Sequence, residues 1–203
     1  MRSPQTVTAL ENLGRERLSK SFFMRDFLYS EISNFHGVPN IPDYPDVAIA
    51  NGRRLCKNLL EPLQATFGRI AIRSAYRSSK INELGNENDH GCSSNEKNYA
   101  AHIWDVPNKD GHGAMACVVI PWFTDQYEAG ADWRAMAYCI HNHLPYGELQ
   151  FFPALCAFNI GWHEKPKRSI SSYIKPKIDI VAGEPPNQIY AEFYKDFPSF
   201  KLE

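Results

Sequence analysis

Three polar side chains in this sequence could together hold a divalent metal ion. His102 and Asp105 stand three residues apart on one short run, and His163 comes much later, directly after Trp162. A catalytic zinc ion takes three His, Asp or Glu ligands and keeps a fourth position open for water. The metal ion then acidifies that water and polarises a carbonyl group. These three residues are the candidate metal ligands.

Other residues could supply the rest of a metal-assisted hydrolysis. Glu148 is the candidate general base, because a carboxylate must move the proton of the attacking water. Arg77 is the candidate cation that holds an oxyanion or a substrate carboxylate. Ser74 and Tyr76, just before it, and Asn98 are the candidate substrate-binding residues.

Each candidate also has a purely structural interpretation. His102 could form a hydrogen bond within a sheet, and Asp105 stands where a strand gives way to a turn before Pro107. His163 could pack in the core beside Trp162. Glu148 could be a charge at a strand edge, and Arg77 could cap a turn. The sequence alone leaves both interpretations open.

Periodicity predicts the elements that must position these residues. A helix is expected from residue 46 to 68, because Leu55, Leu59, Leu63 and Phe67 recur every four residues and form one apolar stripe. A second helix is expected at residues 132–143. Residues 85–98 are rich in Gly and Asn and are expected to form a long functional loop. Strands are expected at residues 69–73, 101–106, 114–120, 148–152 and 157–163.

This order favours an α+β fold, a single domain whose mostly antiparallel sheet is flanked by helices. Residues 1–20 are interpreted as an N-terminal extension, 21–165 as the domain and 166–203 as an extended surface tail. We expect the strands at 70–73, 101–105 and 160–163 to lie side by side, since Asp105 and His163 can share a metal ion only if their strands are close.

Composition excludes several classes of protein. The 203 residues are 43% hydrophobic and 22% charged with a net charge of -1, which gives no electrostatic reason to expect nucleic acid or an anionic membrane as partner. No apolar run is long enough to span a membrane. The first residues do not resemble a signal peptide, and the five cysteines include no C-x-x-C pair. A cytoplasmic location is therefore expected.

Residues 72–78, Ile-Arg-Ser-Ala-Tyr-Arg-Ser, resemble the I-x-S-G-Y-R-S strand and turn of a family of zinc peptidases. This is the D-alanyl-D-alanine carboxypeptidase and L-alanyl-D-glutamate endopeptidase family, which shares its metal-site fold with the hedgehog signalling domain. The resemblance covers roughly residues 22–164. Aligning Asp105 with the last residue of the family motif S-x-H-x-x-G-x-A-x-D places Asn98 where the motif has its first metal-binding His. His163 after Trp162 resembles the final ligand. His102 or His112 would have to replace the missing imidazole, and Glu148 the family's catalytic Glu.

The resemblance implies a hedgehog/DD-peptidase-like fold and a Zn²⁺ cofactor. It also implies carboxypeptidase or endopeptidase action on the peptide stems of peptidoglycan or on related short peptides. An alternative is a catalytically inactive member that binds a peptide, a cell-wall fragment or a protein partner. A third is a structural phage component, since similar domains are common in phage lysis proteins and a phage-type route would deliver the protein to a cell wall. The sequence leaves the oligomeric state open.

Overall fold

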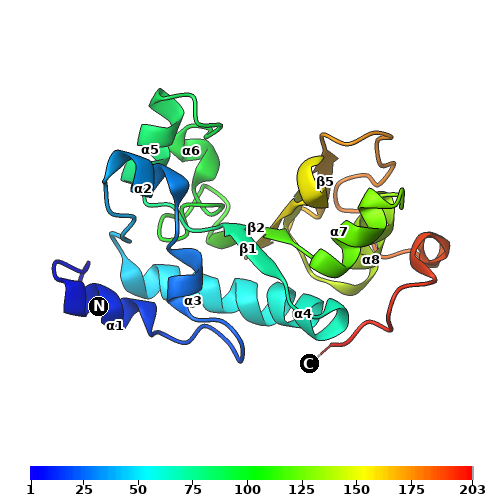
Figure 1. Cartoon of the computed structure of the whole chain (residues 1–203), viewed down its shortest axis with the longest axis horizontal. Coiled ribbons are helices and arrows are strands. Elements are labelled where there is room, and N and C mark those ends of the chain that lie inside the picture. The colour runs from blue at the N-terminus through cyan, green and yellow to red at the C-terminus, as the bar shows by residue number, and fades with distance from the viewer. Residues whose placement is uncertain (203) are drawn as a thin grey trace.

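A long helical rod runs along one side of the molecule (Figure 1). In this computed structural model, which describes residues 1–202, the rod consists of α3 (Pro45–Leu55), a π-helical turn (Cys56–Leu60) and α4 (Glu61–Phe67). Proline suits the first turn of a helix, where its missing N–H is not needed. Gly68 ends the rod with a φ of 81°. The helix expected from the leucine stripe is confirmed.

The rod packs against a five-stranded sheet with the strand order β1-β2-β4-β3-β5. Three neighbouring pairs are antiparallel, and only β3 and β5 run parallel. The expected α+β class and the mostly antiparallel sheet are therefore confirmed. The strands are β1 (Ala71–Ser74), β2 (Gly113–Val119), β3 (Glu148–Phe151), β4 (Phe158–His163) and β5 (Ser169–Ser172).

The two faces of the sheet differ in chemistry, because successive side chains of a strand point to opposite sides. One face is apolar and belongs to the main core with the leucines of the rod; its central strands contribute Ala114, Ala116, Val118, Leu149, Phe151, Phe158 and Ile160. The opposite face carries Met115, Cys117, Gln150 and Asn159. This second face forms the floor of the candidate site.

Helices gather at both ends of the sheet. Figure 1 shows α2, α5 and α6 together at one end and α7 and α8 at the other. Contacts between α2 and α5, and between α5 and α6, hold the first group together. The bounds of the remaining helices are α1 (Val7–Gly14), α2 (Glu31–His36), α5 (Ser79–Glu87), α6 (Asn95–Asn98), α7 (Pro121–Glu128) and α8 (Arg134–His143), with short 3₁₀ turns at Met24–Phe27, Ala154–Cys156 and Gln188–Tyr194.

Two sequence predictions were wrong. Residues 101–106 form tight turns, so β2 is the strand that lies between β1 and β4. The carbonyl groups of Ala101 and His102 accept hydrogen bonds from Met115 and Arg77, contacts that hold the turn in place. Residues 85–98 are not one long loop either. α5 continues to residue 87, starting where Ser78 caps the N–H of Ile81, and α6 occupies residues 95–98.

The segment after residue 166 returns along the molecule. It contributes β5 to the sheet, stacks Tyr190 on Tyr138 of α8, and brings the N–H of Lys201 to the hydroxyl of Thr66 on α4. Figure 1 accordingly shows the last described part of the chain near α4. The predicted tail also included Glu203, which lies outside the described residues. Within residues 1–202, no helix is both long and apolar enough to cross a membrane.

We predict that Gly113→Ala destabilises the fold. A Cβ there would overlap the carbonyl oxygen of Ala100 and come within 2.9 Å of that of Trp162, and neither backbone atom can move freely. Overpacking of this kind costs about 1–3 kcal/mol of unfolding free energy. Gly161→Ala is the control, because its nearest neighbour is the flexible end of Met115 at 3.0 Å. Urea unfolding would measure both, and equal losses would contradict the prediction.

Candidate functional site

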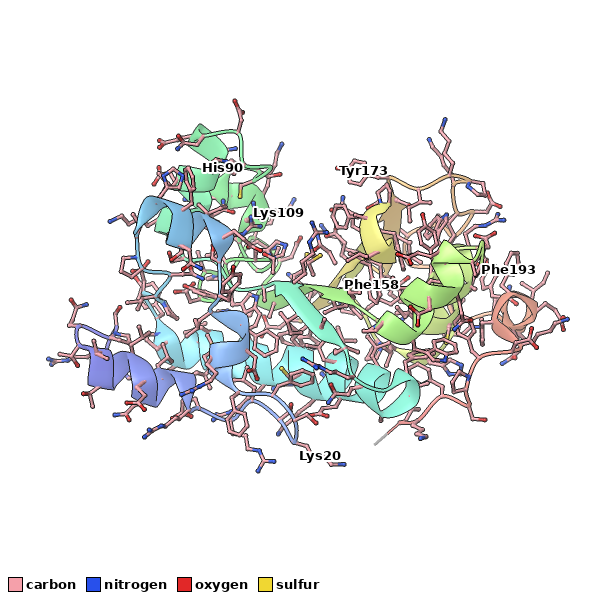
Figure 2. The ribbon with its side chains drawn as sticks, in the orientation of Figure 1. Lys20, His90, Lys109, Phe158, Tyr173 and Phe193 are labelled. Atoms are coloured by element: carbon pink, nitrogen blue, oxygen red, sulfur yellow. The ribbon has the colours of Figure 1, made fainter. Side chains whose placement is uncertain are left out.

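A cleft of about 770 Å³ opens over the polar face of the sheet. Cys117, Gln150 and Asn159, from three adjacent strands, form its floor. Figure 2 labels His90 and Tyr173, which both line the cleft and stand on its opposite sides. The helical group α2, α5 and α6 therefore supplies one wall, and the segment after β5 supplies the other.

A smaller hollow of about 170 Å³ continues along the same face. Met115, Gly161 and Glu148 line it, and each stands two residues along its strand from a residue in the floor of the larger cleft. Residues two apart on a strand face the same side. The two hollows therefore lie one after the other along the strands on this face, and together they are called the groove.

Of the three charged side chains that line the larger cleft, Glu31, Arg73 and Arg77, the least exposed is that of Arg77. Its Nη1 donates to the Sγ of Cys92 at 2.7 Å and its Nη2 donates to the Oδ1 of Asn98 at 3.4 Å, while its buried Nε has no acceptor. In the described part of the chain no carboxylate pairs with this guanidinium. Burial lowers the pKa of Arg77 below its ordinary value, which reflects the cost of holding a cation away from water. The cleft thus contains an uncompensated positive charge.

His102 lines the cleft as a neutral base. Its Nδ1 lies 2.8 Å from the carbonyl oxygen of Ala75 and must donate to it, so the Nε2 keeps its lone pair. Burial, and then the nearby charge of Arg77, lower the pKa of His102 to about 3. Ser74 and Asn98 line the same cleft, and their role in substrate binding stays a prediction.

Asp105 lies in neither hollow. One of its carboxylate oxygens accepts hydrogen bonds from the backbone N–H groups of Asp43 and Tyr44, and the other accepts one from the hydroxyl of Tyr76 at 3.2 Å. The side chain is buried, and the ring of Tyr76 packs edge-on against Trp104. Asp105 therefore fastens the start of α3 to the turn that precedes Arg77. Tyr76 belongs to this packing beneath the site, outside the residues that line the cleft.

His163 and Glu148 do come together, in the smaller hollow. The Nδ1 of His163 accepts a hydrogen bond from the N–H of Lys165 at 2.9 Å. In a neutral ring the proton then sits on Nε2, which faces the Oδ1 of Asn108 at 3.3 Å. Desolvation raises the pKa of Glu148 above its ordinary value, and the charge of Lys167 opposes that shift.

These positions do not fit the zinc centre expected from the sequence. His102 and His163 line different hollows, and the carboxylate of Asp105 already accepts three hydrogen bonds elsewhere. His112, the other substitute, has its Nδ1 3.4 Å from the amide nitrogen of Asn51. Across residues 1–202, no three or more His, Cys, Asp or Glu side chains form a group that could hold a metal ion. Zinc binding at these residues stays a prediction, and it would require the ligands to move.

Sequence reasoning identified Glu148 but missed three residues in the floor of the groove, Cys117, Gln150 and Asn159. Glu148 and Gln150 alternate with the buried Leu149 and Phe151, so the pattern itself indicates that both polar side chains share the face away from the core. The role of Cys92 had no such signal, because only folding brings the turn after α5 against Arg77.

We predict that Asp105→Ala costs roughly 2–4 kcal/mol of unfolding free energy, because buried donors left without an acceptor cost about 1–3 kcal/mol each. Two backbone N–H groups and the hydroxyl of Tyr76 would lose their acceptor. Asp43→Ala is the control, since the side chain of Asp43 is exposed and only its backbone takes part. Urea unfolding measures both, and a loss below that of the control would rule out an anchoring role.

We also predict that His102 makes the fold sensitive to acid. Its pKa falls from 6.5 to about 3 on folding, so between these values the unfolded chain binds a proton that the folded chain does not. Stability should therefore fall as the pH drops from about 6.5, by at most about 1.4 kcal/mol per pH unit. His102→Asn keeps a donor for Ala75 but cannot titrate, so its unfolding free energy should depend less on pH. Identical pH profiles for the two proteins would contradict this assignment.

Comparison with known proteins leaves the site to be interpreted from its own geometry: no family model matches this chain, no curated protein matches it, and no solved structure matches it.

Proposed function

We propose that the groove binds a short, extended peptide and holds a carboxylate of that peptide against Arg77. The partly buried guanidinium, with a buried Nε and no carboxylate partner among the described residues, is the observation that carries this proposal. Withdrawing a cation from water without an anionic partner lowers the stability of the fold, since each buried charge carries a desolvation cost of several kcal/mol. A ligand anion would supply the missing partner.

The Nε and Nη2 donors of Arg77 have the geometry that suits a carboxylate. Nη1 is already engaged by Cys92, whereas the neighbouring Nε has no acceptor and Nη2 has only the long contact to Asn98. An Nε and Nη2 pair can donate two parallel hydrogen bonds to one carboxylate. A carboxylate on this edge would replace the long contact to Asn98, whose amide nitrogen stays bound to the carbonyl groups of Ser93 and Ser94.

The rest of the groove favours a peptide over a small anion. From Arg77 the floor continues over Gln150 and Asn159 to Glu148 in the smaller hollow. Amide side chains can donate to and accept from a peptide backbone. The carboxylate of Glu148 would attract an amino group carried further along the ligand. A stem peptide of peptidoglycan, with a terminal D-alanine carboxylate and an amino side chain, belongs to this chemical class.

A hydrolase with hedgehog/DD-peptidase-like architecture is the second candidate. It is favoured by the shared position of Glu148 and His163, a carboxyl group with a raised pKa beside an imidazole. These two residues would act on a bond lying over the smaller hollow, with Glu148 moving the proton of an attacking water. No third metal-binding side chain joins them, so this candidate requires a rearranged site.

We predict that Arg77→Met weakens peptide binding without loss of stability. The probe is the acetylated tripeptide L-Lys-D-Ala-D-Ala, followed by calorimetry, with its C-terminal amide as the uncharged comparison. Hydrogen bonds to a charged group contribute about 1.5–3 kcal/mol, so the variant should bind roughly 10- to 100-fold more weakly. The melting temperature should stay the same or rise, because a buried unpaired cation is removed.

Arg69→Gln is the matched control, since Arg69 is exposed and does not line the cleft. Equal binding by wild type and Arg77→Met, or equal binding of acid and amide, would overturn the proposal. Incubating the tripeptide with the protein, with and without added Zn²⁺, tests the second candidate. Release of D-alanine that is lost in His163→Gln and Glu148→Gln would favour the hydrolase.

A further inference from the structure

Two histidines, His36 and the cleft-lining His90, face each other at the rim of the cleft. His36 ends α2, and His90 lies in the turn that follows α5. Their Nε2 atoms are 3.0 Å apart. His90 is exposed and His36 is partly exposed, so ions in solution can reach the pair. Figure 2 shows His90 on the helical group that forms one side of the cleft.

The spacing of the two nitrogens suits a shared metal ion. Imidazole nitrogen binds zinc at about 2.0–2.1 Å, so two such ligands at tetrahedral or square angles lie roughly 2.9–3.4 Å apart. The Nε2 atoms already stand at that separation. In the absence of metal the same geometry is a hydrogen bond, in which one ring donates and the other accepts. An ion would replace the shared proton.

Hydrogen bonds fix the backbone near both histidines, and the ring of Phe35 contacts both imidazoles. α2 is capped by Ser30 at its start and by Gly37, with a φ of 65°, at its end. The N–H of His90 donates to the carbonyl of Gly85 at 2.8 Å. Phe35 contacts both imidazoles edge-on, with centroids 5.0 Å from His36 and 6.2 Å from His90. The pair therefore needs little rearrangement to act as two ligands.

We propose that His36 and His90 bind one divalent transition-metal ion, of the class Cu²⁺, Ni²⁺ or Zn²⁺, through their Nε2 atoms. Imidazole is a preferred ligand of these ions. With only two protein ligands, the ion keeps open positions for water or for an anionic group. Phe35 and His90 also line the cleft, so these positions face the same space as Arg77. The two histidines are different side chains from those of the proposed peptide binding, and neither imidazole is hydrogen-bonded to Arg77.

The test is competition for Cu²⁺ or Zn²⁺ with a chromophoric chelator at neutral pH, on the full chain without tag. Wild type should take up one ion at this site. His36→Gln and His90→Gln should each bind it more weakly by about tenfold or more, since loss of even an outer partner of a metal ligand costs roughly 10–100-fold in affinity. Electron paramagnetic resonance of the Cu²⁺ complex should show two nitrogen ligands, falling to one in each variant.

His163→Gln is the comparison that separates this site from the one expected from the sequence. It should leave both the affinity and the resonance spectrum unchanged. Loss of the metal in His163→Gln but not in the other two variants would overturn the proposal, as would unchanged affinity in all three or no uptake by wild type. The substituted side chains lie at the surface, and circular dichroism would confirm that each variant is folded.

Discussion

The buried carboxylate of Asp105 is the interaction on which the site depends. It joins the start of the helical rod, through the N–H groups of Asp43 and Tyr44, to the hydroxyl of Tyr76. Arg77 is the next residue, and its N–H is fixed by the carbonyl of His102 from the same turn. A buried charged acceptor with three donors is a strong and directional anchor. The position of the guanidinium in the cleft follows from this connection between the rod and the turn.

The floor of the cleft is well packed, whereas its wall contains the guanidinium of Arg77, which has no carboxylate partner within residues 1–202. Its floor belongs to strands whose opposite faces are buried in the main core, so the floor residues have little freedom to move. In the wall, the charge of Arg77 is met only by a thiol and an amide. Functional sites commonly keep such unfavourable groups at some cost in stability. A rigid floor beside the unpaired charge of Arg77 is the arrangement expected of a ligand-binding site.

The resemblance to zinc peptidases rests on short sequence motifs. In the folded chain, the candidate ligands His102, Asp105 and His163 lie in three different places. His102 has the tautomer that a metal ligand needs, yet its neighbours are Arg77 and Ala75. His163 has the opposite tautomer and lies in the smaller hollow. A metal ion requires several donors at fixed distances, so correct residue types at correct sequence spacing are not sufficient.

The sequence by itself determined the helical segments at residues 46–68 and 132–143 and most strands, because the periodicity of apolar residues must match the periodicity of the element that buries them. The leucine stripe of the rod and the alternation in β3 are the clearest cases, and together they also determined the α+β class. Only the tertiary structure decided residues 101–106. The sequence predicts a strand there, but hydrogen bonds from the distant N–H groups of Met115 and Arg77 hold these residues as turns. Those contacts turn Asp105 toward α3 and place His102 beside Arg77, and no local pattern encodes them.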